Sequence, residues 1–530
     1  MPLRNARPLR WVPKGVSDTL DGTNTFSGAM AQLKNLIPHP TTMGLYIPRP
    51  ALRALDWTGG PSGDISVLMH TGGQAYFMAS DGSKDLPYCY DIVGEVFIAI
   101  TNAAAGADKP DAWTITDAPP RMELIGTIIT ITHVGYDGAT YFVGWIDISN
   151  PAVPVYSAGN VATQPLAGVP HDIAQMTNRA YYAVGNALEI SDVNNPKVRT
   201  NATQVLTIGD GTEITGIGPL SLSTFVSGGV VQSLIAFKEN IAYQITGDFA
   251  PAVGYQVNAV NAAVGTTSPA SVASVSGGLI FRAPDGMRLI DLQANVTPPI
   301  GDAGQGVTLP FIYALQPEIM RAAANANVLR ISVRNGQAIT TPWQEWWYHL
   351  TRQEWTGPHT CPAQVIDHYG SSFIMAPFDN PGQLYISDVF PTLTPTYVEF
   401  GTQLTFSYQT VLLPDTGTAM LSALVETALM TALPFASTLS VTAVDDNNQL
   451  LDSTIVDSIS NAAALWGFAL WGGFLWGSVS SLTQRRVKWS KPLTFKQMSI
   501  LLTGNSADGI QIGNLYMNFQ QLGYMVAGGR

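Results

Sequence analysis

The sequence predicts an all-β protein with a β-propeller-like body, an extended N-terminal arm and a C-terminal domain of the β-sandwich type. Three observations lead to this prediction. Short runs of β-branched and aromatic residues are separated by Asp-Gly and Gly-Gly pairs along most of the chain, which is the signal of β-hairpins. These hairpins recur without a strict repeat and without a helical layer between them. Prolines crowd the start of the chain, and strands rich in Thr and aromatic residues follow its middle.

Residues 1–60 are predicted to form the extended arm. They contain the stretches RPLRWVPKG and NLIPHPTTMGLYIPRPAL. Proline lacks the backbone donor that regular elements need, so its repetition disfavours helices and paired strands. The arm also carries the one basic run of the chain, with no acidic residue before Asp18. This run is either a solvated charge cluster or a docking contact for a partner, and its members are Arg4, Arg7, Arg10 and Lys14.

Residues 61–393 are predicted to form the propeller-like body. Residues 65–83 and 126–149 each hold two apolar runs that are parted by glycines or by an Asp-Gly turn. Two further pairs of runs turn at residues 238–240 and 284–286. Many small sheets without helices between them are typical of a ring of propeller blades, or of stacked sandwiches.

Two stretches contain many residues that favour helices. Residues 317–327 begin with a proline, contain helix formers and predict a short surface helix within the body. Residues 418–435 also suit a helix, but their place between strands suits a β-hairpin or a crossover, and both alternatives stay open.

Residues 394–530 are predicted to form the sandwich-type domain. Apolar and polar residues alternate on either side of a turn at Asp445 to Asn448, which indicates a hairpin. Residues 494–526 follow the same order, with a strand, a turn of Asn, Asp and Gly, and a second strand.

The stretch ALWGFALWGGFLWG repeats Leu-Trp-Gly every five residues, at Trp466, Trp471 and Trp476. No charge occurs between Asp457 and Arg485, so a membrane span is one alternative. However, a period of five places successive side chains on different faces of a helix or a strand, and membrane spans keep Trp for their ends. Base or sugar stacking would need basic or hydrogen-bonding neighbours. We therefore expect turns that pack each indole against the domain or a neighbouring subunit, and no stable membrane span.

Charged residues make up 12% of the sequence, about half of the roughly 25% that is usual in soluble proteins. Such a surface favours a permanent assembly, in which much of it is covered by other subunits. The formal net charge of -12 argues against a reader of duplex DNA, which would carry a basic stripe. It is compatible with DNA that slides past an acidic wall.

The cysteine and histidine patterns predict no catalytic residue, no cofactor and no metal site. Cys89 and Cys361 make no disulfide framework, and the lack of a secretory signal favours folding in the cytoplasm. The closest group of metal-ligand types lacks any standard spacing, so we interpret its members as ordinary core or loop residues: His359, Cys361, Asp367 and His368. No nucleophile elbow or zincin helix is present, so the sequence does not support an enzyme.

Several distinctive stretches follow one another in order along the chain. They are residues 35–52, 234–249, 263–292, 345–357 and 373–388, the Trp-Gly repeat, and the closing IQIGNLYMNFQQLGYM of residues 510–525. Together they resemble the tail hub or nozzle proteins of short-tailed bacteriophages, the group that includes the packaged-DNA stabilisation protein of lambdoid podoviruses. The most specific part of the resemblance is formed by Gly265, Ser268, Pro269, Ser271, Val272, Ala273, Gly278, Phe281, Asp285 and Gly286.

The resemblance implies a structural virion protein of the phage tail, assembled in the host cytoplasm. Its family members have a β-propeller-like body and assemble as a homo-oligomeric ring, usually a hexamer. The ring extends the channel of the portal and adaptor proteins, retains packaged DNA and opens for genome ejection. Tail fibres or spikes and a plug or needle attach to it, and DNA passes through the lumen without sequence-specific binding. On this basis, the basic arm would strap onto the adaptor or a neighbouring subunit.

Two other functions remain alternatives at this point. One is a carbohydrate-binding or carbohydrate-cleaving propeller of a phage tail, which would release reducing ends from host polysaccharide if it is a hydrolase. The other is a minor capsid protein or a membrane-active minor virion protein, which the position of the protein in the particle would distinguish.

Overall fold

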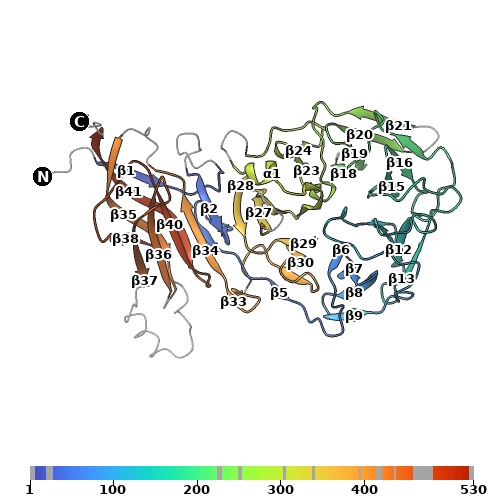
Figure 1. Cartoon of the computed structure of the whole chain (residues 1–530), viewed down its shortest axis with the longest axis horizontal. Helices are drawn as coiled ribbons and strands as arrows, with labels where there is room; N and C mark the ends of the chain where they lie inside the picture. Colours follow the sequence, from blue (N-terminus) through green and yellow to red (C-terminus); the bar gives the residue numbers. More distant parts are fainter. Residues whose placement is uncertain are drawn as a thin grey trace.

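The computed structural model describes residues 6–18, 28–223, 230–248, 254–301, 306–336, 341–392, 395–413, 420–434, 437–457 and 482–524. Within these ranges the regular secondary structure is almost entirely β-strand, arranged as a propeller and a sandwich that lie side by side (Figure 1). The helical elements are single turns: α1 (Leu309–Ile312), η1 (Pro269–Ser271) and η3 (Pro317–Ile319). The predicted fold class is therefore confirmed.

Within the described chain, six small antiparallel sheets that are separate from one another form blades of the propeller (Figure 1). From the centre outward, their strands are β6 (Ile65–Thr71), β7 (Gln74–Ser80), β8 (Asp85–Asp91) and β9 (Val96–Ile98); β10 (Arg121–Ile125), β11 (Ile128–Thr132), β12 (Val143–Asp147) and β13 (Val155–Gly159); β14 (Asp172–Met176), β15 (Arg179–Val184), β16 (Ala187–Ile190) and β17 (Val205–Thr207); β18 (Gly216–Ser223), β19 (Val230–Phe237), β20 (Ala242–Asp248) and β21 (Gly254–Ala259); β22 (Ala273–Val275), β23 (Gly278–Ala283) and β24 (Gly286–Asp291); and β29 (Ala363–Tyr369), β30 (Ser372–Pro377), β31 (Tyr385–Ser387) and β5 (Arg53–Ala54).

A further group of four strands completes the ring between the β22 and β29 sheets. These strands are β25 (Arg321–Ala324), β26 (Val328–Val333), β27 (Gln344–His349) and β28 (Glu354–His359). They are not a separate sheet, because β28 also pairs with β2 (Met30–Lys34) and so continues into the sandwich. The ring closes where β5 pairs with β31, with Ala54 opposite Tyr385.

Both faces of a blade are covered by its neighbours, which explains the continuous apolar runs of the sequence. Strand β7 is buried at five consecutive positions. One face contributes Phe77 to a core shared with Ile374 of the last blade, and the other contributes Met78 to a core shared with Ile129 of the next blade. Each large side chain buried in this way stabilises the fold by roughly 1.5–3 kcal/mol.

The sandwich consists of two facing sheets. One contains β1 (Ala6–Trp11), β3 (Leu36–Pro38), β4 (Tyr46–Pro48), β35 (Met420–Ala432), β38 (Thr483–Val487), β39 (Leu493–Phe495) and β41 (Gln511–Tyr524). The other is the far part of the nine-stranded sheet, with β2, β34 (Thr405–Thr410), β36 (Thr438–Asp445), β37 (Leu450–Asp457) and β40 (Met498–Asn505). A short hairpin, β32 (Val398–Glu399) with β33 (Thr402–Gln403), precedes β34.

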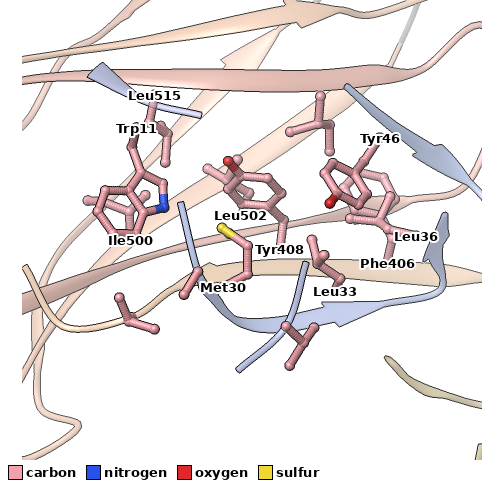
Figure 2. Packing of buried hydrophobic residues seen from close by; sticks show 14 of the residues in the cluster. Trp11, Met30, Leu33, Leu36, Tyr46, Phe406, Tyr408, Ile500, Leu502 and Leu515 are labelled. Carbon is pink, nitrogen blue, oxygen red and sulfur yellow. The ribbon is translucent and has the colours of Figure 1, made fainter. Parts of the chain in front are cut away.

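The core between these two sheets is shown in Figure 2. Trp11 and Leu515 extend from the first sheet, and Met30, Tyr408 and Ile500 extend from the second. Trp11 is 6% exposed and the other four are fully buried. This core is therefore built jointly from the beginning and the end of the chain.

The segment that the sequence predicts as an extended arm forms β-strands, and these strands pair with strands from the rest of the chain. Strand β1 lies antiparallel to β41, with Trp11 opposite Leu515, and β2 lies between β28 and β34. Pro8 and Pro38 lie on β1 and β3, which are edge strands, where a missing donor is tolerated, and Pro48 is the last residue of β4.

The two stretches rich in helix formers are also extended. The helix predicted over residues 317–327 is wrong: only η3 is helical, and β25 follows it, because pairing with β26 outweighs local propensity. Residues 420–432 form β35, which pairs with β41 along nearly its whole length. The open choice between helix and β-structure at residues 418–435 is settled as a strand within the described residues.

Candidate functional site

The described part of the predicted basic run lies on β1 and in the segment that follows it. Arg4 lies outside the described residues, and Arg7 is placed only by its backbone, opposite Phe519. Arg10 and Lys14 are exposed. The Arg10 guanidinium lies 5.8 Å from the ring centroid of Tyr516, so it packs along β41. A role of this run in docking stays a prediction.

The Trp repeat at Trp466, Trp471 and Trp476 lies outside the described residues. Its packing therefore stays a prediction. In the ranges that the structure describes, no helix has the length and apolar character needed to cross a bilayer.

The structure splits the group of His359, Cys361, Asp367 and His368 into two places. The ring Nδ1 of His359 accepts a hydrogen bond from the Asn35 N–H at 3.0 Å, and the Cys361 thiol donates to Glu345 at 2.8 Å. Both residues are buried at the junction of propeller and sandwich. Across the described ranges, no three His, Cys, Asp or Glu side chains are placed to hold a metal ion.

The innermost strands of the propeller enclose a central cavity of about 520 Å³. Its wall includes residues of β6, β10, β22, β25 and β29. Sequence analysis did not identify this cavity, because its lining residues come from six separate parts of the chain, including Pro219 of β18. The charged and titratable side chains of the wall are Arg121, Glu123, Arg321, His70, Asp367 and His368.

Two arginines lie at the end of the cavity where the inner strands begin. Arg121 is the first residue of β10, and Arg321 is the first residue of β25. The Arg121 Nε donates to Asp172 at 3.1 Å. Arg321 is 7% exposed, and its guanidinium lies 5.5 Å from the ring centroid of Trp113. Burial, together with the positive charge of Arg121, lowers the pKa of Arg321 to about 9, so it remains charged at neutral pH.

A cluster of histidines and an aspartate lies near the opposite ends of β6 and β29. The Asp367 carboxylate accepts hydrogen bonds from the His70 N–H at 2.6 Å and from the His368 Nδ1 at 2.9 Å. The hydrogen bond that His368 donates to Asp367 raises the pKa of His368, whereas burial lowers the pKa of His70. Between the two ends, burial raises the pKa of Glu123 to about 7. The cavity thus has a cationic end and a titratable end.

A second hollow, of about 720 Å³, lies where β27, β28 and the last blade meet the adjoining loops. Its wall contains Asp64, Asp379 and an aromatic pair, in which Trp343 stacks on Phe378 with ring centroids 4.2 Å apart. The guanidinium of Arg334 also lies over Trp343, at 4.8 Å. Much of the indole surface is therefore already in contact.

Comparison with known proteins gives similar solved structures but no family. No protein-family model and no curated protein matches the chain. A computationally designed protein, Ika8, is 11% identical, with a TM-score of 0.35, and the match covers 64% of this chain and 100% of that one. The Dos1 propeller is 10% identical, with a TM-score of 0.35 and coverage of 68% and 92%. A protein from Lactobacillus plantarum is 12% identical, with a TM-score of 0.33 and coverage of 55% and 83%. These scores are low, so the fold assignment rests on the sheets themselves.

Proposed function

We propose that the protein is a structural subunit of the tail of a short-tailed bacteriophage. In this role, copies assemble into a nozzle or hub ring that extends the portal and adaptor channel, retains packaged DNA and opens for genome ejection. Tail fibres or spikes and a plug or needle would bind to the same ring. The observation that carries the proposal is the ordered series of sequence features that resembles this family, from residue 35 to residue 525.

The most specific passage of that series has a clear physical role in the propeller. It leads from β21, the outer strand of one blade, to β22, the inner strand of the next. A Cβ at Gly265 would lie 1.8 Å from the Lys238 carbonyl oxygen, so only glycine allows the two segments to approach. The Ser271 hydroxyl donates to the Ser268 carbonyl at 2.7 Å and accepts from the Arg282 N–H at 3.0 Å. The passage therefore builds a junction between blades, which agrees with the propeller body that the resemblance implies.

Exposed apolar side chains on strand edges support an assembly of several copies. Strand β37 is an edge of the nine-stranded sheet, and Leu450 and Ile455 on it are each 65% exposed. Val93 and Val96 are exposed at the rim of the first blade. Contact with other subunits would remove such surface from water. The net charge of -12 suits a ring through which DNA slides without sticking.

The proposal is tested by the state of the purified full-length protein. Light scattering after gel filtration and negative-stain images should show a ring with rotational symmetry, with six copies as the family expectation. A protein that remains a monomer over a wide range of concentrations, and in the presence of portal and adaptor proteins, contradicts the proposal.

The contribution of the basic run is tested by charge rather than by deletion. Removing residues 2–14 would also remove β1 and the buried Trp11, so a loss of assembly would have no clear cause. The double substitution Arg10→Gln and Lys14→Gln changes exposed side chains only. We expect weaker attachment to the adaptor in phage tails, with the folded ring unchanged. Normal tails that retain DNA would show that this run is a solvated cluster.

A second candidate, a carbohydrate-binding or carbohydrate-cleaving propeller, is favoured by the 720 Å³ hollow with its carboxylates and aromatic pair. Against it, Phe378 and Arg334 already cover much of Trp343, whereas a sugar would need a free aromatic face. Incubation with host polysaccharide distinguishes the two functions. Release of reducing ends, lost in an Asp379→Asn variant, would favour the carbohydrate function over the nozzle.

A further inference from the structure

We propose that the central cavity of the propeller binds a small oxyanion, a phosphate or a carboxylate, between the guanidinium groups of Arg121 and Arg321. This inference does not depend on the role of the protein in a phage tail. It rests on the geometry of the cationic end of the cavity.

Arg321 is a buried cation that has carbonyl partners but no carboxylate. Its Nε donates to the Gln364 carbonyl at 2.8 Å, and its Nη1 donates to the Ile319 carbonyl at 2.9 Å. No ion pair to Arg321 is formed within the described ranges. Buried charges in proteins are normally paired, because a lone ion loses its hydration without compensation. The Nη2 group makes no hydrogen bond with the described chain, and the residue lines the cavity.

Arg121 supplies a second guanidinium to the same end. Its Nε is used by Asp172, which is fully buried and also accepts hydrogen bonds from the Ile173 N–H at 2.9 Å and the Ile217 N–H at 2.8 Å. The Asp172 carboxylate is thus shared between the Arg121 Nε and two backbone N–H donors. The terminal nitrogens of Arg121 make no hydrogen bond with the described residues, and they can donate to a ligand in the cavity.

Arg121 and Arg321 line the same cavity, and burial, together with the positive charge of Arg121, lowers the pKa of Arg321. An anion between them would turn this repulsion into two attractions. Guanidinium groups bind carboxylates and phosphates through paired N–H donors. A cavity of about 520 Å³ admits a small molecule. Trp113, 9% exposed, packs on Arg321 and holds its guanidinium in place.

The test is calorimetric titration of the full-length protein at neutral pH with inorganic phosphate and, separately, with citrate, at constant ionic strength. We expect saturable binding of one ligand per chain for at least one of the two probes. The affinity of the Arg121→Gln variant for the bound probe should be lower by about tenfold, because a charge-assisted hydrogen bond is lost. The matched control is Arg53→Gln, which removes an arginine that is also paired with a carboxylate, Glu95, but lies on the surface.

Arg321 is tested by Arg321→Lys, which keeps the charge and removes the planar pair of donors. This variant should also bind more weakly if it has the circular dichroism and melting behaviour of the parent. If it does not fold, the result for Arg121→Gln decides. The proposal is overturned if neither probe binds saturably, or if Arg121→Gln binds as the parent does. Ring formation is measured in a separate experiment, so failure here leaves the proposed tail function standing.

Discussion

The junction between propeller and sandwich contains charged side chains that are removed from water. Arg330 and Glu345 are both fully buried, and the Arg330 Nε donates to the Glu345 carboxylate at 2.6 Å. The same guanidinium lies 4.7 Å from the ring centroid of Trp347. Removing either partner of such a buried ion pair is strongly destabilising, because the other charge remains buried without compensation.

We therefore predict that Glu345→Gln lowers the free energy of unfolding by about 3–5 kcal/mol, because Arg330 would remain buried without a counter-charge. Urea unfolding followed by tryptophan fluorescence measures the change. The control is Glu95→Gln, the same chemical change in the exposed pair with Arg53, for which about 1 kcal/mol or less is expected. Equal effects of the two substitutions would contradict this account of the junction.

The pH dependence of stability is predicted from a buried histidine. His349 is 4% exposed, and its Nε2 lies 3.0 Å from the Thr356 hydroxyl. Burial, aided by nearby Arg352, lowers the pKa of His349 to about 3, whereas an unfolded histidine has a pKa of about 6.5. The unfolded state therefore binds a proton that the folded state does not, so stability falls as pH decreases from about 6.5 towards 3.

The His349→Gln variant should lose this contribution. Its unfolding free energy should fall less steeply with decreasing pH than that of the parent, by up to about 1.4 kcal/mol per pH unit. Glu123 acts in the opposite sense, because its raised pKa of about 7 makes stability rise as pH falls from 7 towards 4.5. The quantity to measure is consequently the difference in unfolding free energy between variant and parent as a function of pH. Identical pH profiles would show that His349 titrates normally in the folded protein.

At the scale of elements, the sequence located hairpins well because their signals are local. The turns predicted at residues 238–240 and 284–286 lie between β19 and β20 and between β23 and β24. The pairing of β1 with β41 could not be predicted, since Trp11 and Leu515 are about as far apart in sequence as the chain allows. Helix propensity was also misleading at β25 and β35, because strand pairing there outweighs the local preference for helix.

The passage between β21 and β22 gives a prediction at this scale. Gly265→Ala should destabilise the protein strongly, because the new Cβ would overlap the Lys238 carbonyl oxygen, which is fixed by the backbone. Gly277→Ala, in the turn before β23, is the matched control, because no atom lies within 4 Å of its Cβ position. Thermal melting of the two variants measures the difference. If the Gly265→Ala protein has the same melting temperature as the control, the backbone at residue 265 does not approach the Lys238 carbonyl so closely.

At the scale of the whole molecule, the candidate site depends on closure of the ring. Arg121 and Arg321 are far apart in the sequence, and neither lies in a motif. They meet because both begin inner strands of a closed propeller, and a single sequence carries no signal for that juxtaposition. The fold class, in contrast, follows from short-range turn and strand patterns repeated along the chain, and it was predicted.

The last prediction concerns cooperativity between the propeller and the sandwich. The nine-stranded sheet begins at the centre of the propeller with β25 and ends in the sandwich with β37. Beside it, Arg49 and Glu399 form a buried ion pair at 2.8 Å, and the Arg49 Nε donates to the Asn35 side chain at 3.0 Å. Neither part can unfold without breaking this sheet and exposing unpaired charges.

We therefore expect one calorimetric unfolding transition for the whole chain rather than two. Glu399→Gln, which leaves Arg49 buried without its counter-charge, should lower the transition temperature and begin to separate the transition into two. Arg53→Gln, which changes an exposed arginine of β5 in the last blade that pairs with Glu95, should leave the single transition unchanged. Two resolved transitions in the unaltered protein would mean that the shared sheet does not couple its two ends, and that the propeller and the sandwich are independent units.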